Sequence, residues 1–530
     1  MLAAIGLVHL TASAQDAQPS DFLSDNIDKI VIGILAIILF SLVFALFMMG
    51  DRLVKVSAER AGKDEKYSLL PRLLPDAQPP KRTVLRLKKG FDIVLKGKPM
   101  QTIEPLQSAT YAVRPIDFPG MSPIPKTVVE KGSEVMAGDP LFYDKLQPEV
   151  MYCAPVSGEV IDVIRGDKRR ITDVLILADG QIRFKDFGKV EAARLTSEFI
   201  TKRLLESGAW PLIRQRPFNV VPSPKETPRY IYISCFDTAP LAPDYDFIVS
   251  GKGAEFQAGI DVLSKLTSGP IRLGLNAAGT PSEVFTKARG VELYWFKGPH
   301  PAGNPGVQMH HIDPVNKGDT VWTVNPQDVI IIGRLFTEGR FNTEKIVALA
   351  GSEIKRPRYF KAYVGANVEG VLKDNLEQDH VRVISGNVLT GKRIEKNGHI
   401  GFFDNVVTVI EEGDKYEFMG WLFPSYPRPS VSPTFGSFFF RGEELKVNSN
   451  THGEERPFVV TGRYEEVLPM DIYPMQLFKA ILTEDFEKME GLGIYEVVEE
   501  DVALCEFVCP SKQEIQTIVR KGLDLIREQG

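Results

Sequence analysis

The sequence predicts a multidomain protein of the α+β class, tethered to a membrane by one N-terminal helix. Its 530 residues exceed the roughly 250–300 at which one hydrophobic core stops growing, so we expect several domains. Glycine-separated β-branched runs flank a stretch in which strand and helix signals alternate. One uncharged segment of 21 residues, 30–50, stands apart from this soluble pattern.

The net charge and the number of cysteines indicate which partners and which cellular compartment to expect. The net charge is -6, from 63 basic and 69 acidic residues. Nucleic acid is therefore not an expected partner, because phosphate backbones require a broad cationic surface. Four cysteines in a chain of this length do not make a disulfide framework, which favours a reducing compartment for most of the protein.

The first 14 residues resemble a signal peptide. A short apolar stretch ends in Ala12-Ser13-Ala14, a small-residue pattern that predicts cleavage before Gln15. The basic residues that usually begin such a peptide are missing, so an uncleaved tail and a misplaced start codon stay open as alternatives.

Residues 29–50 are predicted to form a transmembrane helix. The apolar run "IVIGILAIILFSLVFALFMMG" reaches about 30 Å at 1.5 Å per residue, which is one hydrocarbon thickness, and a buried core helix is the alternative. Acidic residues dominate before the run and basic residues follow it, so the positive-inside rule places the C-terminal body in the cytoplasm. Residues 51–82 form a linker, with four prolines between Ser68 and Arg82.

Residues 83–190 are predicted to form a small β domain of the barrel-sandwich type found in biotinyl and lipoyl carriers. The segment "VEKGSEVMAGDPLF" and the turn "APVSG" supply the paired-glycine rhythm, with Gly132 and Gly138 at turns. A carrier needs a lysine at a tight hairpin tip. Lys145 is the candidate, but its hairpin looks too long, so we favour a structural barrel over a swinging-arm carrier.

Residues 191–352 are predicted to form an α/β layered domain. Strands are expected at "YIYISC", "IRLGLN", "ELYWF" and "KIVALA", and helices at "FQAGIDVLSKL" and "PQDVIIIGRLF". The stretch "GKGAEF" places Gly251 and Gly253 after a strand-like "DFIVS". The third glycine of a dinucleotide fingerprint is replaced by Phe256, which disfavours NAD binding.

The rest of the chain is predicted as a β domain, 353–463, and a small helical domain, 464–530. The motif "GNVLTGKR" in the β domain imitates a P-loop, but Arg393 stands where magnesium binding needs Ser or Thr. The last helix is amphipathic, because one face carries Ile515, Val519, Leu523 and Ile526.

Two clusters could carry chemistry. The segment 296–316 holds three of the seven histidines; adjacent His310 and His311 would point to opposite faces of a strand, which disfavours a shared metal. A rigid loop, a ligand or quinone contact and a metal site are the alternatives. Cys505 and Cys509 resemble half of an iron-sulfur motif, with a buried structural pair, a redox dithiol and a cluster as alternatives.

These motifs together resemble the A subunits of the sodium-pumping NADH:quinone oxidoreductases (Nqr). The resemblance covers about 445 residues, from "LKKGFDIVLKGKP" to the C-terminus. It rests on a series in the right order: "APVSGEV", "ESGAWPLIRQRPF", "GPHPAG", "MHHIDPVN", "RVISGNVLTG" and "EEDVALCEFVCPSK". About 85 residues at the N-terminus depart from the family, whose members begin near the equivalent of Leu87.

The resemblance implies a component of an NADH:quinone reductase that pumps Na⁺ outward across the bacterial inner membrane. In that family, FAD, FMN, riboflavin and iron-sulfur centres lie on other subunits, while the A subunit carries no redox cofactor and sits at the cytoplasmic quinone-reducing side. Its partners would be the five other Nqr subunits (B to F), chiefly the membrane-embedded B subunit, and quinone. It also implies that the α/β domain is Rossmann-like and that "VGANVEGVL" begins a β-grasp domain of the soluble-ligand-binding (SLBB) kind.

No catalytic or metal-ligating residue is expected on this chain. If quinone touches the protein, His300 and His310 are the expected contacts, because an imidazole can hydrogen-bond a quinone carbonyl. A second hypothesis is a membrane-tethered, non-catalytic scaffold of another Rnf-like electron-transfer complex. A third is an enzyme that binds NADH or flavin itself, and the broken fingerprint at Phe256 weighs against it.

Overall fold

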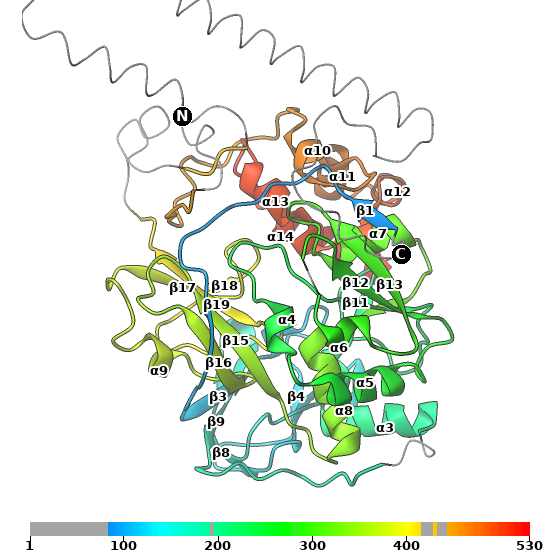
Figure 1. Cartoon of the computed structure of the whole chain (residues 1–530), viewed down its shortest axis with the longest axis vertical. Coiled ribbons are helices and arrows are strands. Elements are labelled where there is room, and N and C mark those ends of the chain that lie inside the picture. The colour runs from blue at the N-terminus through cyan, green and yellow to red at the C-terminus, as the bar shows by residue number, and fades with distance from the viewer. Residues whose placement is uncertain (1–82, 191–194, 280, 415–427, 432–442, 530) are drawn as a thin grey trace, which may run out of the picture. The chain divides into compact units, whose positions relative to one another are not determined.

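A computed structural model describes residues 83–190, 195–279, 281–414, 428–431 and 443–529 (Figure 1). The predicted signal peptide 1–14, transmembrane helix 29–50 and linker 51–82 lie outside these residues. Within the described part of the chain, no helix is both long and apolar enough to cross a bilayer.

The barrel-sandwich domain consists of two small antiparallel sheets. One has the strand order β3-β9-β8-β5 and the other β4-β6-β7. Their bounds are β3 Thr110–Val113, β4 Lys126–Thr127, β5 Glu134–Val135, β6 Pro140–Asp144, β7 Gln147–Cys153, β8 Gly158–Arg165 and β9 Ile171–Ala178. Lys145 and Leu146 form the turn between β6 and β7, so the hairpin is tighter than its sequence suggested.

The α/β domain is built on a six-stranded sheet with the order β1-β13-β12-β11-β14-β10. All neighbours are parallel except the edge strand β10. The strands are β1 Val84–Arg86, β10 Arg214–Arg216, β11 Ile231–Ser234, β12 Ile271–Asn276, β13 Val291–Lys297 and β14 Val321–Thr323. From β11 the chain passes to β12 on one side and returns as β14 on the other, which makes a topological switch point beside β11.

Six α-helices of the described chain accompany these strands. They are α3 Ser197–Ser207, α4 Tyr245–Ile248, α5 Gly253–Leu263, α6 Glu283–Thr286, α7 Pro305–Ile312 and α8 Pro326–Thr337. Two of them correct the sequence analysis. The strand-like "DFIVS" begins inside helix α4, and the predicted histidine loop contains helix α7, which ends at Ile312.

The second six-stranded sheet has the order β18-β17-β19-β15-β16-β2 (Figure 1, left). Its strands are β2 Met100–Pro105, β15 Glu344–Ala350, β16 Arg358–Tyr363, β17 Val381–Ser385, β18 Lys392–Ile394 and β19 Val406–Glu411, with the short helix α9 Glu369–Leu372. The strand predicted at "KIVALA" exists as β15, but it pairs with β16 and β19 in this sheet instead of joining the α/β sheet.

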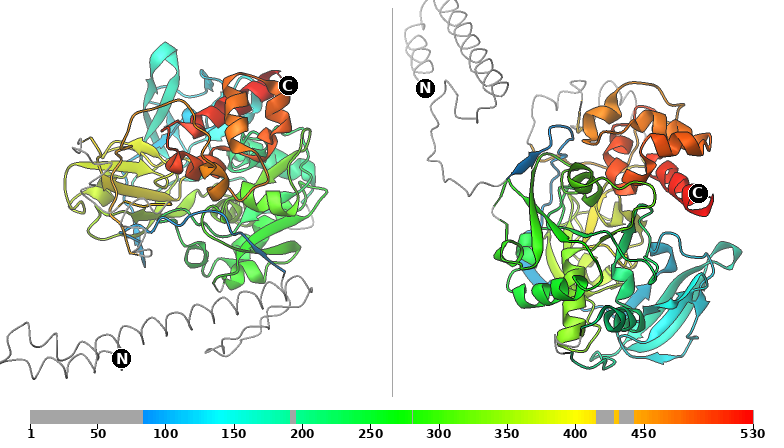
Figure 2. Two further views of the ribbon diagram at one scale, coloured as in Figure 1. Left: turned by 90° about the horizontal axis from the view of Figure 1, so that it is seen from above. Right: turned by 90° about the vertical axis from the view of Figure 1, so that its right-hand side faces the viewer.

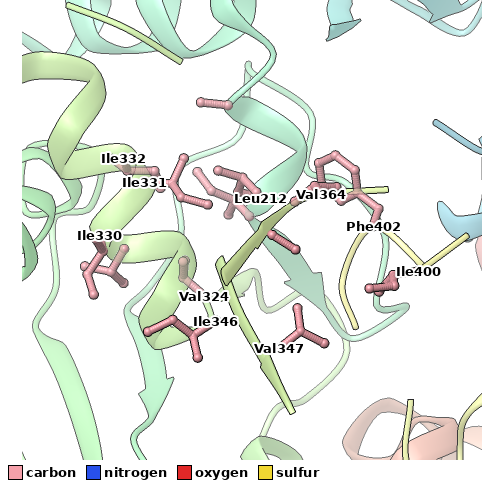
Figure 3. Close-up of a cluster of buried hydrophobic side chains, with 14 of the residues drawn as sticks. Leu212, Val324, Ile330, Ile331, Ile332, Ile346, Val347, Val364, Ile400 and Phe402 are labelled. Carbon is pink, nitrogen blue, oxygen red and sulfur yellow. The ribbon is translucent and has the colours of Figure 1, made fainter. Parts of the chain in front are cut away.

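The two large sheets share one apolar core. One cluster of buried apolar side chains contains Ile330, Ile331 and Ile332 of α8 together with Ile346 and Val347 of β15, all labelled in Figure 3. Burying side chains of this size contributes roughly 1.5–3 kcal/mol each. The shared core therefore holds the two domains in a fixed relation.

Five helices close the described chain: α10 Arg463–Val467, α11 Pro474–Leu482, α12 Phe486–Gly491, α13 Glu499–Val508 and α14 Ile515–Gln529 (Figure 2). The amphipathic face predicted for the last helix is confirmed, since Ile515, Val519, Leu523 and Ile526 are all buried. Charged contacts tie these helices to the α/β domain, among them the ion pairs of Arg216 with Glu500 and Asp501.

Candidate functional site

A cleft of about 810 Å³ opens where the strands of the α/β sheet end. Phe236 and Asp237 follow β11, His300 follows β13, and Asn325 follows β14. The turn between β17 and β18 and the helices α13 and α14 complete the walls. Ligands of open α/β sheets bind at the carboxyl ends of the strands, beside a switch point, and this cleft lies there.

His300 is the predicted contact that the structure places in the cleft. Its side chain is buried, with the residue 3% exposed, and its Nδ1 lies 3.2 Å from Oγ1 of Thr238. Its Nε2 has no hydrogen-bond partner within the described chain. Burial lowers the pKa of His300 to about 4, so the ring is neutral at physiological pH.

His310 lies outside the residues that line the cleft, and its ring serves the fold. The backbone N–H of Asp471 donates to Nε2 at 2.9 Å, so the ring proton sits on Nδ1, 2.7 Å from the Glu496 carboxylate. His311 bonds the Pro469 carbonyl at 2.7 Å. Both histidines therefore anchor α7 to the C-terminal helices, which leaves His300 as the better candidate for a ligand contact.

An arginine pair that the sequence analysis did not single out faces the cleft. Arg214 and Arg216 are two positions apart on β10, so their side chains leave the same face of the strand. Arg216 is 3% exposed and pairs with Glu500 and, at 3.2 Å, with Asp501. Arg214 stacks on the Phe403 ring, 3.7 Å from its centre. The sequence feature that could have revealed this pair is an Arg-x-Arg pattern inside the otherwise apolar "WPLIRQRPF".

Carboxyl groups in and beside the cleft have raised pKa values. Burial raises the pKa of Asp237 to about 6, and it raises the pKa of Asp501 above its usual range despite the nearby Arg216. Burial also raises the pKa of Asp404, which accepts a 2.6 Å hydrogen bond from Ser385. These groups carry less negative charge near neutral pH than exposed carboxylates would.

The other sequence motifs form no ligand site of their own within the described chain. Gly251 and Gly253 lie where α5 begins, and Phe256 packs in the core against Phe285, in the space that a dinucleotide fingerprint keeps for glycine. The P-loop imitation is the tight turn between β17 and β18 and is followed by a strand. In the described residues no group of His, Cys, Asp or Glu is arranged to hold a metal ion.

The four cysteines are free and buried in two different cores. Cys153 and Cys235 belong to the core of the sheets, whereas Cys505 and Cys509 belong to the C-terminal core. Cys509 Sγ lies 3.0 Å from the Tyr464 hydroxyl, and burial raises the pKa of Cys505 well above its usual range. A buried, protonated thiol is a poor nucleophile and a poor metal ligand.

Three family models match consecutive parts of the chain. They are the NqrA N-terminal barrel-sandwich hybrid domain at 85–179, the NqrA second alpha/beta domain at 195–341, and the NQRA C-terminal (SLBB) domain at 346–396. The barrel-sandwich and SLBB-like domains of the sequence analysis are thereby confirmed.

Curated relatives cover the same part of the chain. The A subunit of a Na(+)-translocating NADH-quinone reductase from Neisseria meningitidis serogroup B is 38% identical over 454 residues, which are 84% of this chain and 100% of the relative. Its counterpart from Yersinia pseudotuberculosis is 37% identical over 451 residues, with the same coverage. A solved NAD⁺-reducing [NiFe]-hydrogenase aligns at 11% identity and a TM-score of 0.35, over 63% of this chain and 62% of that one.

Proposed function

Since the chain belongs to the NqrA family, the A subunits of Na⁺-translocating NADH-quinone reductases, we propose that its cleft is where it contacts quinone. The chain is one component of an enzyme complex that couples NADH oxidation and quinone reduction to Na⁺ transport. The alternative of a scaffold in another Rnf-like complex is not favoured, because NqrA relatives match at 36–38% identity over most of the chain.

The unpaired Nε2 of His300 is the observation that carries the proposal. The Thr238 hydroxyl accepts the Gly303 N–H at 2.9 Å, so its own proton is free to be donated to Nδ1 of His300. The ring proton then sits on Nε2, where it can donate to a quinone carbonyl oxygen. A buried donor without a partner is costly, and a carbonyl in the cleft would satisfy it.

We further propose that the protein carries no redox cofactor and that electrons reach its quinone from flavins and iron-sulfur centres on other subunits. The fingerprint broken at Phe256 and the separation of the cysteines into two cores support this. The B subunit of the complex is the proposed neighbour in the membrane, and residues 29–50 are the proposed anchor of a cytoplasmic body. Such an anchor would raise the local concentration of the body at the membrane.

Steady-state kinetics of the assembled complex with His300→Ala tests the quinone contact. Loss of one hydrogen bond worth about 0.5–1.5 kcal/mol raises the KM for quinone by about two- to twelvefold. His399→Ala is the matched control, because this half-buried histidine bonds Thr110 at 3.1 Å and does not line the cleft. A KM for quinone that is unchanged in His300→Ala would remove the proposal.

A further inference from the structure

No described residue accepts a hydrogen bond from the guanidinium group of Arg214. One face of the group lies on Phe403, but within the described chain no side chain forms an ion pair or a hydrogen bond with it. The residue is half-buried, and its partial removal from water lowers the pKa of Arg214 below its usual value. An arginine stays charged even so, hence the cleft contains a cation without a bonded counter-ion among the described residues.

Three carboxyl groups act electrostatically on Arg214, and each of them is bonded to another residue. Asp328 pairs with the Lys345 ammonium at 2.7 Å, and Asp404 accepts from Ser385. Glu500 pairs with Arg216. Lys345 and Arg216 thus have carboxylate partners within bonding distance, whereas Arg214 has none among the described residues and only feels the charge of these carboxyl groups from farther away.

Further side chains that line the cleft have polar atoms without a hydrogen-bond partner in the described chain. Three side chains that line the cleft are at least nine-tenths buried and each keeps one atom without a hydrogen bond in the described chain: His300 Nε2, Arg216 Nε and Asn219 Oδ1. Two of the three atoms can act as donors. Their coincidence in one cavity points to a ligand that carries acceptor oxygens.

Two helix ends at the cleft have partners on the protein. The N-termini of α7 and α8 lie at the cleft, where Asn304, Pro305 and Asn325 line it. The first turn of α7 has no acidic residue, and Asp328 in the first turn of α8 is paired with Lys345. The Asp501 carboxylate lies against Gly306 in the first turn of α7, and the Asn325 side chain accepts the Gln327 N–H at the start of α8, so the protein itself satisfies both helix ends.

We propose that the cleft binds an aromatic oxyanion, a carboxylate or a phosphate ester, whose acidic group sits on Arg214. The planar guanidinium offers two parallel N–H groups that match such an oxyanion, while Phe403 holds the group in place. Phe236, Phe402 and Tyr245 line the same cavity and supply apolar surface for a ring. The proposal goes beyond the quinone contact and does not depend on it.

Isothermal titration calorimetry of the full chain at constant ionic strength tests this site with three probes that share a phenyl ring. Benzoate and phenyl phosphate separate the two acid classes, and neutral benzamide is the isosteric control for benzoate. We expect at least one acid to bind at least tenfold more tightly than benzamide. We expect Arg214→Gln to weaken that binding at least tenfold, and Arg214→Lys to recover part of it, because lysine keeps the charge without the bidentate geometry.

Arg203→Gln is the matched control, because Arg203 also stacks on a phenylalanine, Phe199 at 5.1 Å, but lies outside the cleft. It should leave the affinity for the acid unchanged. Thermal unfolding of each variant shows that it is folded. Binding of neither acid, or equal affinity in Arg214→Gln and the unsubstituted chain, would overturn the proposal.

Discussion

The acid–base behaviour of single residues follows from the burial of charge around the cleft. Asp237 has an ordinary pKa of 3.8 when unfolded and about 6 when folded. Because the folded value is the higher one, this group favours the folded state at low pH, and that stability is lost as the pH rises through about 4 to 6. A neutral asparagine in place of Asp237 does not titrate, so the variant does not lose this stability as the pH rises.

We therefore predict that Asp237→Asn becomes more stable relative to the unsubstituted chain as the pH rises. Between about pH 4.5 and about pH 7.5 the difference in the free energy of unfolding should change by about 2 kcal/mol in favour of the variant. Denaturant unfolding at a series of pH values measures it. A difference that stays constant with pH would show that the pKa of this carboxyl is not raised.

Arg216 is predicted to be far more important for stability than an exposed cation. Replacing it in Arg216→Met strands Asp501, which is 1% exposed, and a broken buried pair costs about 3–5 kcal/mol. Lys287→Met breaks an exposed pair with Glu283 and should cost less than about 0.5 kcal/mol. Equal losses in the free energy of unfolding for the two variants would contradict the buried network.

Single residues also show how far sequence reasoning reached into the site. The histidine-rich segment 296–316, with its "GPHPAG" loop, drew attention to His300, which the structure places in the cleft; its contact with quinone stays a prediction. Arg214 could not be singled out from the sequence. Its distinguishing feature is that no described side chain forms a hydrogen bond or an ion pair with it, and such partners come from segments distant in the chain. The same limit applies to His310, because both of its ring nitrogens form hydrogen bonds with the C-terminal domain, to Glu496 and to the backbone of Asp471.

At the scale of elements, helices α5 and α8 pack closely enough to require glycine at the contact. A Cβ on Gly259 would lie 2.1 Å from the Val329 carbonyl oxygen, and one on Gly333 would lie 2.0 Å from that of Glu255. Neither contact can relax by turning a side chain, since both are with backbone atoms.

Gly259→Ala should destabilise the protein by about 1–3 kcal/mol through overpacking. Gly253→Ala, in the first turn of the same helix, is the control. Its added methyl would meet only Val284, at 3.9 Å, and alanine favours the helix. Thermal or denaturant unfolding of both variants tests this, and a Gly259→Ala protein as stable as the control would refute the close contact.

The local sequence predicted single strands and helices well, but it did not predict which sheet each strand joins. The strands at 231–234, 271–276 and 291–297 and the helices α5 and α8 were predicted from their patterns. Sheet membership was not: β1 joins the α/β sheet, and β2 and β15 join the second large sheet, although all three were assigned to other domains. Hydrogen bonds between distant segments decide such pairings, and periodicity does not report them.

For the whole molecule, we predict a purified chain without flavin or iron-sulfur absorbance in the visible range. The Phe256 side chain fills the place of a fingerprint glycine, and the cysteines lie in two separate cores. An absorption spectrum before and after denaturation measures this. Released flavin, or a bleachable cluster band, would contradict the proposal that redox centres lie on other subunits.

The cleft connects these scales, because parts of all four described domains line it and its walls carry His300, Arg214 and carboxyl groups with raised pKa values. The most direct test of its role is a structure of the assembled complex with quinone bound. The account predicts the quinone ring in this cleft, with a carbonyl oxygen in hydrogen-bond reach of Nε2 of His300. A ring held entirely by other subunits, with this cleft free of quinone, would contradict it.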